Sequence, residues 1–510
     1  MRRVGFASLP IVLVFAALIG ASATWATSST PATTRPSLTG ESSATTRPAQ
    51  PAESHVVIFH TNDVHGRIDN FAKVAAILDA ERKTGADVFF FSAGDNFTGD
   101  PVIDRYDPPG EPIVELLDRL HVDVISIGNH EFDYGLEAVR KLTARFRTVS
   151  ANIETKGLLP GLQPYIVLTA KDGIKIVVFG IIQIEPGNGL PSTHPDKVKG
   201  LSFSEPLAKA LELKNLRAQG QIFVGLTHIG FDQDLLLAKE MPEIDVIIGG
   251  HSHTRVDPAE TVNGVLVAQA GAENQFLGRI DLLLRDGKVV EKKGRLIDLS
   301  KVRDEDPEIK ALIAKFHQSP AMARVIAHAP VEITGKNALG SLMTDAICKM
   351  HGLDIAFQNN GGIRINRLPR AITLNDVYTL DPFGNQIVRI DMTPDEIRGL
   401  IWSSCERRHD IDLQVSGISY FVRDEGVLRL QDIELRRPDG SPLPEDRTYK
   451  VGLSSYIASS YQFAHKDPGR TLGITTAEAL ISYLESSPDL SVYREVQRAH
   501  YQKSAGSPRD

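Results

Sequence analysis

Five short polar clusters in the first half of the chain carry carboxylate, amide and imidazole side chains. They are Asp63-Val-His65, Gly94-Asp95, Gly128-Asn-His-Glu-Phe-Asp133, Thr227-His228 and Gly249-Gly-His-Ser-His253. Oxygen and imidazole donors of these types bind divalent metals in proteins. One carboxylate shared by two ions about 3.5–4 Å apart is the usual feature of a two-metal hydrolytic site. The clusters therefore predict a dinuclear hydrolytic centre.

Each cluster directly follows a run of apolar residues that favours a strand. The runs are 56–59, 88–91, 124–127, 222–226 and 245–248. We expect five strands whose ends deliver the polar side chains to one edge of a sheet. Apolar residues at helical spacing predict helices at 70–83, 112–120, 136–146 and 206–219. Residues 55–300 therefore have the alternation typical of an α/β domain.

The second half of the chain predicts a separate unit, because 510 residues exceed what one core accommodates. Residues 301–328 are expected to form a linker with a helix at 304–316. From 329 to 498 helices and strands are mixed. The expected helices are 339–351, 394–405 and 476–485, and the expected strands are 355–357, 386–392 and 450–453. Residues 499–510 are interpreted as a polar, frayed tail.

The first 54 residues have the composition of an export signal and a tether. Arg2 and Arg3 precede an apolar stretch at 9–19, and 21–23 offer a small-residue cleavage site. An uncleaved anchor is the alternative, although the stretch is shorter than the ~20 residues that span a membrane. Residues 24–54 are rich in Thr, Ser, Pro and Ala, which predicts a disordered tether. We expect an exported protein, periplasmic or extracellular, with no stable membrane span after cleavage at 23.

Charge and cysteine content exclude some classes of protein. The formal net charge is −8 and no basic block occurs, which argues against a nucleic acid polymer as partner. Two cysteines, Cys348 and Cys405, are too few for a disulfide scaffold, and neither has zinc-site spacing. We expect two free thiols, with a single bridge as the alternative.

The order of the five clusters resembles the calcineurin-like metallophosphoesterases. The strings Thr61-Asn-Asp-Val-His-Gly66 and Gly128-Asn-His-Glu-Phe-Asp-Tyr-Gly135 are similar to the 5′-nucleotidase/UDP-sugar hydrolase branch of that family. The resemblance covers about 55–500. It implies an α/β fold: an N-terminal four-layer α/β/β/α sandwich followed by an α+β, 5′-nucleotidase-like domain that binds the substrate.

The resemblance also implies the ligands of two divalent metal ions. The positions that match one metal site are Asp63, His65, Asp95 and His253. Those that match the other are Asp95, Asn129, His228 and His251. Many 5′-nucleotidases carry Gln where His253 stands. The additional imidazole suits Zn, Mn or Fe, and the residues do not choose among them.

The same resemblance implies roles for His130 and Asp133. His130 matches the family histidine that faces the substrate phosphate, and Asp133 matches the acid that orients it. An imidazolium at this place can protonate the leaving oxygen, while Asn129 contacts the phosphate. The alternative for Asp133 is a cap on the helix that begins near Leu136.

In the second unit, Gln358-Asn-Asn-Gly-Gly-Ile-Arg364 and Asp381-Pro-Phe-Gly-Asn385 resemble two turns of the nucleotidase C-terminal domain. Glycines allow a ligand to approach the backbone, and an arginine can bind an anionic oxygen with two donors. The substrate-binding candidates are Arg364, Asn360, Gly361, Phe383 and Tyr456.

Base recognition departs from the family, which clamps the base between two aromatic rings. Tyr456 matches one ring, but residues 412–417, where the second should fall, contain no aromatic residue. Ser460-Tyr-Gln-Phe463 replaces the family Gly-Gly-Asp-Gly string, and Gln462 is the nearest match by count to the ribose-binding Asp. We therefore expect weak discrimination between bases.

These observations together predict an exported metallophosphoesterase that hydrolyses small nucleoside phosphates or related phosphate esters and anhydrides. The alternatives are a 2′,3′-cyclic-nucleotide phosphodiesterase/3′-nucleotidase, a UDP-sugar hydrolase, a related sulfur-compound hydrolase and a non-catalytic binding protein. A complete set of ligand-type residues argues against the last. The sequence predicts no oligomeric state.

Overall fold

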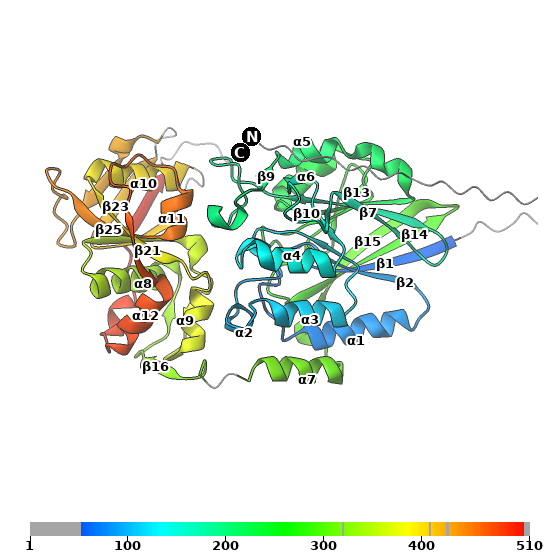
Figure 1. The fold of residues 1–510 in the computed structure, drawn as a ribbon, viewed down its shortest axis with the longest axis horizontal. Coiled ribbons are helices and arrows are strands. Elements are labelled where there is room, and N and C mark those ends of the chain that lie inside the picture. Colours follow the sequence, from blue (N-terminus) through cyan, green and yellow to red (C-terminus); the bar gives the residue numbers. More distant parts are fainter. Residues whose placement is uncertain (1–52, 319–320, 407–409, 425–427, 504–510) are drawn as a thin grey trace, which may run out of the picture. The chain divides into compact units, whose positions relative to one another are not determined.

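The computed structural model describes residues 53–318, 321–406, 410–424 and 428–503 (Figure 1). The predicted signal and nearly all of the predicted tether lie outside these residues. None of the described helices is both long and apolar enough to cross a membrane.

The first part of the chain, residues 53–298, forms two large sheets. The seven-stranded sheet has the order β15-β14-β1-β2-β3-β4-β6, and the six-stranded sheet has the order β12-β13-β11-β10-β8-β7. The strands of the first are β1 Glu53–Thr61, β2 Asp87–Ser92, β3 Val124–Ser126, β4 Thr148–Val149, β6 Leu162–Gln163, β14 Phe276–Arg285 and β15 Lys288–Asp298. Those of the second are β7 Tyr165–Thr169, β8 Lys175–Ile182, β10 Ile222–His228, β11 Val246–Ile248, β12 Glu260–Val262 and β13 Val265–Ala268.

Alternation along β1 shows how the layers are built. Val56 and Ile58 belong to the apolar cluster shared with β10 and β11 of the other sheet, whereas Val57 and Phe59 pack with the helices. Successive side chains of a strand point to opposite faces, so β1 is buried on both sides. The two sheets therefore pack face to face.

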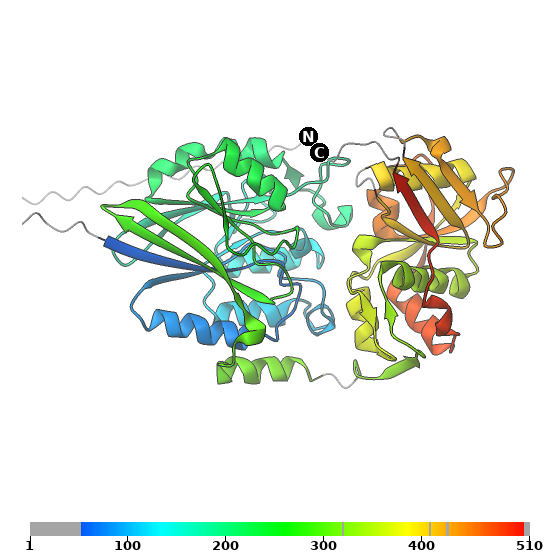
Figure 2. The ribbon, with the colours of Figure 1, turned by 180° about the vertical axis from the view of Figure 1, so that it is seen from behind.

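Helices cover the two outer faces of this pair of sheets (Figures 1 and 2). The seven-stranded sheet is covered by α1 Phe71–Arg82, α3 Glu111–Arg119 and α4 Leu136–Arg145. The six-stranded sheet is covered by α5 Pro206–Leu211 and α6 Phe231–Glu240. The four-layer α/β/β/α arrangement is confirmed.

Two details differ from the sequence-based expectation. The polar clusters do not meet at one edge of a single sheet. Three follow β1, β2 and β3, whereas in the second sheet one forms the end of β10 and the other follows β11. Strands buried on both faces have the same continuous apolar pattern, so the pattern does not reveal which sheet a strand joins.

The helix expected at 206–219 is in fact α5 followed by a 3-10 helix, Lys214–Gln219. Leu207, Leu211 and Leu216 all pack against the same apolar cluster. A helix interrupted in this way therefore has the same hydrophobic spacing as a continuous one.

The expected linker helix is α7, Pro307–Phe316, and it packs against α1. The Asp306 side chain caps it by accepting a hydrogen bond from the Ile309 amide at 2.9 Å. Proline at the first helical position fits because its missing N–H would have no helical partner there.

Residues 321–503 contain a five-stranded sheet with the order β22-β18-β25-β21-β26 and a three-stranded sheet with the order β24-β23-β27. The strands are β18 Ile355–Asn359, β21 Gln386–Met392, β22 Leu413–Ser416, β23 Ser419–Asp424, β24 Ile433–Arg436, β25 Tyr449–Ser454, β26 Arg470–Thr475 and β27 Ala499–Lys503. The helices are α8 Lys336–His351, α9 Leu374–Leu380, α10 Pro394–Glu406, α11 Ser455–Ser460 and α12 Thr476–Glu485. Cys348 and Cys405 are both free, as expected.

The expectation of a frayed tail from residue 499 is wrong for its first five residues. They form β27, which pairs in parallel with β23. Ala499 is buried and Tyr501 packs against the same core, with its hydroxyl donating to Asp424 at 2.6 Å. Polar residues at the alternate positions conceal this two-residue period in the sequence.

Candidate active site

The loops after the strands hold most of the predicted metal ligands in an unusual backbone conformation. Five of the seven ligands have positive φ angles. They are Asp63 (49°), His65 (50°), Asp95 (54°), His251 (79°) and His253 (57°). A non-glycine residue in this region costs about 1–3 kcal/mol and persists only where the surrounding structure enforces it. The strained backbone thus directs these side chains toward one another.

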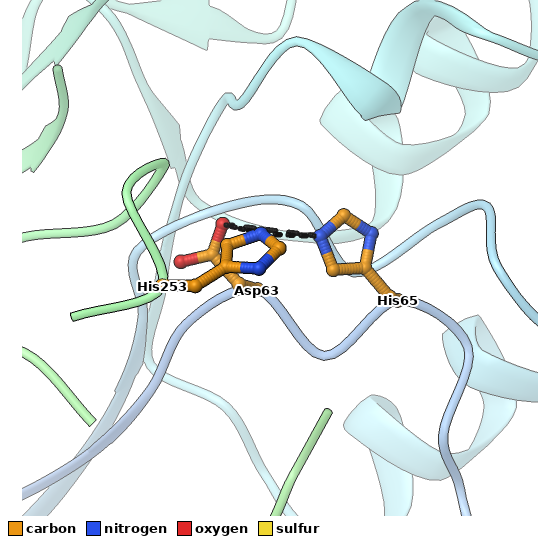
Figure 3. Close-up of side chains that lie close together, drawn as sticks. All are labelled: Asp63, His65 and His253. Carbon is orange, nitrogen blue, oxygen red and sulfur yellow. Dashed lines mark hydrogen bonds and ion pairs between the residues drawn. The ribbon is translucent and has the colours of Figure 1, made fainter. Parts of the chain in front are cut away.

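Asp63, His65 and His253 form the first group of converging side chains (Figure 3). The Nε2 atoms of His65 and His253 lie 3.0 Å apart, and Asp63 Oδ1 lies 3.4 Å from His253 Nε2. The Nδ1 atom of His65 faces the Thr98 carbonyl oxygen at 2.9 Å, so it carries the proton and leaves Nε2 with a lone pair. A carboxylate and imidazole nitrogens that face one another in this way fit a divalent cation.

Asp95, His228, His251 and Asn129 form the second group. His228 Nε2 lies 3.0 Å from Asp95 Oδ2, and His251 Nδ1 lies 3.0 Å from Asn129 Oδ1. The Nδ1 atom of His228 donates to the Ala93 carbonyl at 2.7 Å. Such a backbone acceptor fixes the ring and its tautomer, as it does for histidines that bind metals. This donor set also fits a divalent cation.

Burial and neighbouring charges together control the protonation of these imidazoles. It lowers the pKa of His251 to about 4 and, together with the Arg364 guanidinium, holds the pKa of His65 well below its ordinary value. Burial opposes the charged form of His228 as well, but the Asp95 carboxylate raises that pKa to about 10. Near pH 7 His65 and His251 are therefore neutral, which is the form that binds metals.

Glu131 is a buried carboxylate that the sequence analysis did not single out. It accepts hydrogen bonds from the amides of Asp95 (2.9 Å), Asn96 (2.7 Å) and Gly128 (2.7 Å). These donors belong to the two loops that present Asp95 and Asn129. Glu131 thereby fixes the two loops to each other. Its signal in the sequence was its place inside the string that ends at Asp133.

Close backbone approach explains the glycines beside the ligands. A Cβ atom at Gly128 would lie 2.2 Å from Asp95 Oδ1, and one at Gly250 would lie 2.7 Å from His228 Nδ1. No other residue has a side chain small enough for either position. The backbone at Gly250, in the loop after β11, therefore passes close to His228 at the end of β10.

His130 and Asp133 form a hydrogen-bonded pair, with Nδ1 of the ring 2.6 Å from Asp133 Oδ2. Burial opposes a positive charge on His130, but Asp133 and Asp95 outweigh it and raise its pKa above the ordinary value. The alternative role for Asp133 is wrong, because Gly135 occupies the cap position of α4 and no side chain caps that helix.

These groups open into a cavity of about 560 Å³ lined from both parts of the chain. Of the predicted substrate-binding residues, Arg364, Gly361, Phe383 and Tyr456 line it, and Asn360 does not. The side chain of Asn360 instead donates to the Ile411 carbonyl at 2.8 Å. Asn359 lines the cavity in its place.

Arg364 reaches from the second part of the chain to the first group of ligands. Its Nη2 atom lies 3.1 Å from His65 Nε2. The Phe383 ring lies beneath the guanidinium at 5.7 Å and stacks on His130 with ring centres 5.8 Å apart. A permanently charged guanidinium here can bind an anion held at the metal ligands.

Two tyrosines form the wall of the cavity farther from the ligands. Tyr456 and Tyr461 meet edge to face, with ring centres 6.3 Å apart and an angle of 83° between the planes. The Tyr461 hydroxyl donates to Asp412, so an aromatic ring does lie beside 412–417, although it comes from another segment. Rings at this angle do not form a parallel clamp. Gln462 bonds the Gly187 carbonyl and does not line the cavity.

The segment 183–198 supplies a wall that no motif in the sequence indicated. Glu185, Ser192, Thr193, His194 and Lys197 of this segment line the cavity. The Ser192 carbonyl accepts a hydrogen bond from the Asn129 side chain at 3.1 Å. Loop residues of this kind have no characteristic spacing, so only the folded structure reveals them.

Two family models match the chain. The calcineurin-like phosphoesterase model matches residues 56–255, and the 5′-nucleotidase C-terminal domain model matches residues 320–463. Together the matches include the predicted ligands, the His130–Asp133 pair, Arg364 and Tyr456.

Known proteins that are similar to this chain are consistent with the two family models. The chain is 28% identical to the 5′-nucleotidase of Vibrio cholerae serotype O1 over 520 residues, covering 86% of this chain and 92% of that protein. It is 26% identical to the trifunctional nucleotide phosphoesterase protein YfkN of Bacillus subtilis over 84% of this chain, but it spans only 34% of YfkN. The crystal structure of a 5′-nucleotidase precursor from Thermus thermophilus superposes with a TM-score of 0.73 at 26% identity, covering 85% of this chain and 96% of that one.

Proposed function

Because this chain belongs to the calcineurin-like metallophosphoesterases that carry a 5′-nucleotidase C-terminal domain, we propose that it hydrolyses nucleoside phosphates at a dinuclear metal centre. Membership makes it a metal-dependent hydrolase of phosphoric esters. Beyond this membership, we propose the number of ions, the roles of individual residues and the choice of nucleotide.

The convergence of metal-ligand atoms in two adjoining groups is the observation that carries this proposal. His65 and His253 bring two imidazole nitrogens within 3.0 Å of each other, and the same spacing separates His228 from Asp95. We assign one ion to Asp63, His65, Asp95 and His253, and the other to Asp95, Asn129, His228 and His251. Four imidazoles favour Zn, Mn or Fe over Mg or Ca.

Bound divalent ions would act as Lewis acids on the phosphate and would activate water for its hydrolysis. The protein supplies the rest of the chemistry. Asn129 gives one amide N–H to the Ser192 carbonyl, and its second N–H can bind a phosphate oxygen. His130 uses Nδ1 for Asp133, so Nε2 remains to give a proton to the leaving oxygen.

The far side of the cavity suits the leaving group. Arg364 can bind an anionic oxygen of the substrate beside the metal ligands, and Phe383 and Tyr456 offer flat apolar surfaces. A base can stack on one ring face, but the edge-to-face tyrosines do not enclose it. We therefore propose broad use of nucleotides, with other phosphate esters and anhydrides as secondary substrates.

Export is a further part of the proposal, and it rests on the pattern of residues 1–23. Protein recovered outside the cytoplasm should begin near residue 24. Mass spectrometry of its N-terminus tests this, and an intact Met1 on exported protein would contradict cleavage.

Product analysis by chromatography, together with phosphate release, tests the activity of metal-loaded protein. Both readouts are needed because UDP-glucose yields UMP and glucose 1-phosphate, and a cyclic nucleotide yields a nucleoside monophosphate, without free phosphate. The substrates are 5′-, 3′- and 2′,3′-cyclic nucleotides and UDP-glucose, and Asp95→Asn is the matched inactive control. We expect release from 5′-nucleotides by the wild type alone. Hydrolysis of only the 3′- and cyclic nucleotides would favour the phosphodiesterase alternative, and hydrolysis of none of these substrates would overturn the proposal.

A further inference from the structure

Thr193 contacts the His130–Asp133 pair, lines the cavity beside it and is only 3% exposed. Its hydroxyl donates to Asp133 Oδ1 at 2.8 Å, while the other carboxylate oxygen, Oδ2, contacts His130 Nδ1 at 2.6 Å. Each oxygen of Asp133 thus has its own partner. The threonine comes from the segment 183–198, which neither the sequence motifs nor the proposed mechanism uses.

This second contact has a geometric consequence. The terminal side-chain torsion of an aspartate has a broad range of allowed values. A single hydrogen bond to His130 therefore leaves the carboxylate free to rotate. A partner on the opposite oxygen removes that freedom. Acceptors that are themselves held by a further hydrogen bond fix the orientation and tautomer of an imidazole.

The same segment also forms part of the cavity wall. His194 and Lys197, which follow Thr193 closely, line it, and the Ser192 carbonyl holds the Asn129 amide at 3.1 Å. One stretch of backbone therefore connects the wall of the cavity, a proposed phosphate contact and the support of the proposed proton donor.

We propose that Thr193 is a positioning residue that orients the Asp133 carboxylate, so that His130 Nε2 points at the leaving oxygen. This inference rests on the proposed function. A positioned proton donor matters most for a leaving group that cannot carry negative charge by itself. The hydroxyl of Thr193 should therefore be needed for nucleoside esters and not for esters of acidic phenols.

The test compares Thr193→Val, Thr193→Ser and the wild type on AMP and on p-nitrophenyl phosphate. Valine keeps the shape of threonine and deletes the donor, whereas serine keeps the donor. We expect Thr193→Val to lower kcat on AMP at least about tenfold, with KM unchanged, and to alter kcat on p-nitrophenyl phosphate less than about twofold. Thr193→Ser should restore most of the activity on AMP.

Thr143→Val is the matched control, because Thr143 is also a buried threonine of this part of the chain and lies outside the cavity. Metal content and melting temperature, measured for every variant, separate positioning from damage to the fold or to the centre. Equal losses on both esters, no loss on AMP, or failure of serine to rescue would overturn the role of Thr193. Hydrolysis of neither ester by metal-loaded wild type would overturn the proposed function, and this inference with it.

Discussion

At the scale of residues, the proposed mechanism assigns metal binding and action on the substrate to different side chains. Asp95 contacts His228 and accepts the His130 amide at 2.8 Å, so it lies between the two kinds. His130 itself contacts Asp133 and Phe383 and is turned toward the cavity. Substitutions at Asp95 and at His130 should therefore have different consequences.

His130→Ala should keep the bound metal but lose about 10²–10⁴-fold in turnover, because only the proton donor is removed. Asp95→Asn should lower the metal content of both sites, since the neutral amide replaces the shared carboxylate. Elemental analysis beside kcat distinguishes the two variants. Metal loss in His130→Ala with full loading of Asp95→Asn would invert the assignment.

Glu131→Gln should destabilise the protein and loosen the centre. The buried carboxylate accepts from three amides, and a glutamine would turn an N–H group toward donors. The expected cost is about 1–3 kcal/mol in the free energy of unfolding, with weaker metal binding. Urea unfolding measures it, and Glu137→Gln on the exposed face of α4 is the control. Identical unfolding of the two variants would show that Glu131 does not stabilise the two loops.

Much of the site is predictable from sequence. Ligands that are one or two residues apart in a short motif can take few positions relative to one another. The structure brings Asp63, His65 and His253 together as the motifs implied. Glu131 and Thr193 escaped prediction because hydrogen bonds to loop backbone or to a distant carboxylate leave no periodic pattern. Asn360 was misplaced for a related reason: in a glycine-rich turn, a shift of one residue decides which side chain faces the cavity.

At the scale of elements, strand ends and glycine turns set the distances within the site. Helix and strand positions follow from apolar periodicity, as α12 and β21 illustrate. The assignment of strands to two sheets does not, because each strand is buried on both faces. The final strand, β27, was missed because its polar residues alternate with only two that contact the core.

Gly128→Ala should displace the Asp95 carboxylate. The new methyl group would lie 2.2 Å from Oδ1, a distance that real Cβ contacts do not reach, so the loop must shift. We expect a fall in metal content and in turnover. Gly187→Ala is the control, since its Cβ would meet nothing within 4 Å. Equal metal content in the two variants would show that the loops tolerate the shift.

At the scale of the whole molecule, residues separated by 299 positions meet where Arg364 contacts His65. The sequence could assign Arg364 to a ligand-binding turn, but it could not predict which group the guanidinium would face. Long-range contacts of this kind depend on how both parts of the chain fold. Under the proposed function, substrate binding would depend on two separate segments, one for the phosphate and one for the leaving group.

Adenine and uracil 5′-nucleotides should differ by less than about tenfold in kcat/KM, because loss of a stacking contact costs on the order of 1 kcal/mol. Arg364→Ala should lower kcat/KM for both nucleotides alike, since the guanidinium binds an anionic oxygen and does not contact the base. Steady-state kinetics on AMP and UMP measure this. A strong preference for one base that disappears in Tyr456→Ala would show that a base clamp exists.

We propose that seven side chains hold two metal ions on which hydrolysis depends. Elemental analysis of the purified full chain, made alongside phosphate release from AMP before and after treatment with a strong chelator, tests it most directly. We expect close to two transition-metal ions per chain, loss of activity when the metal is removed, and recovery when Zn, Mn or Fe is returned. Full activity in chelator, from protein without bound metal, would contradict it.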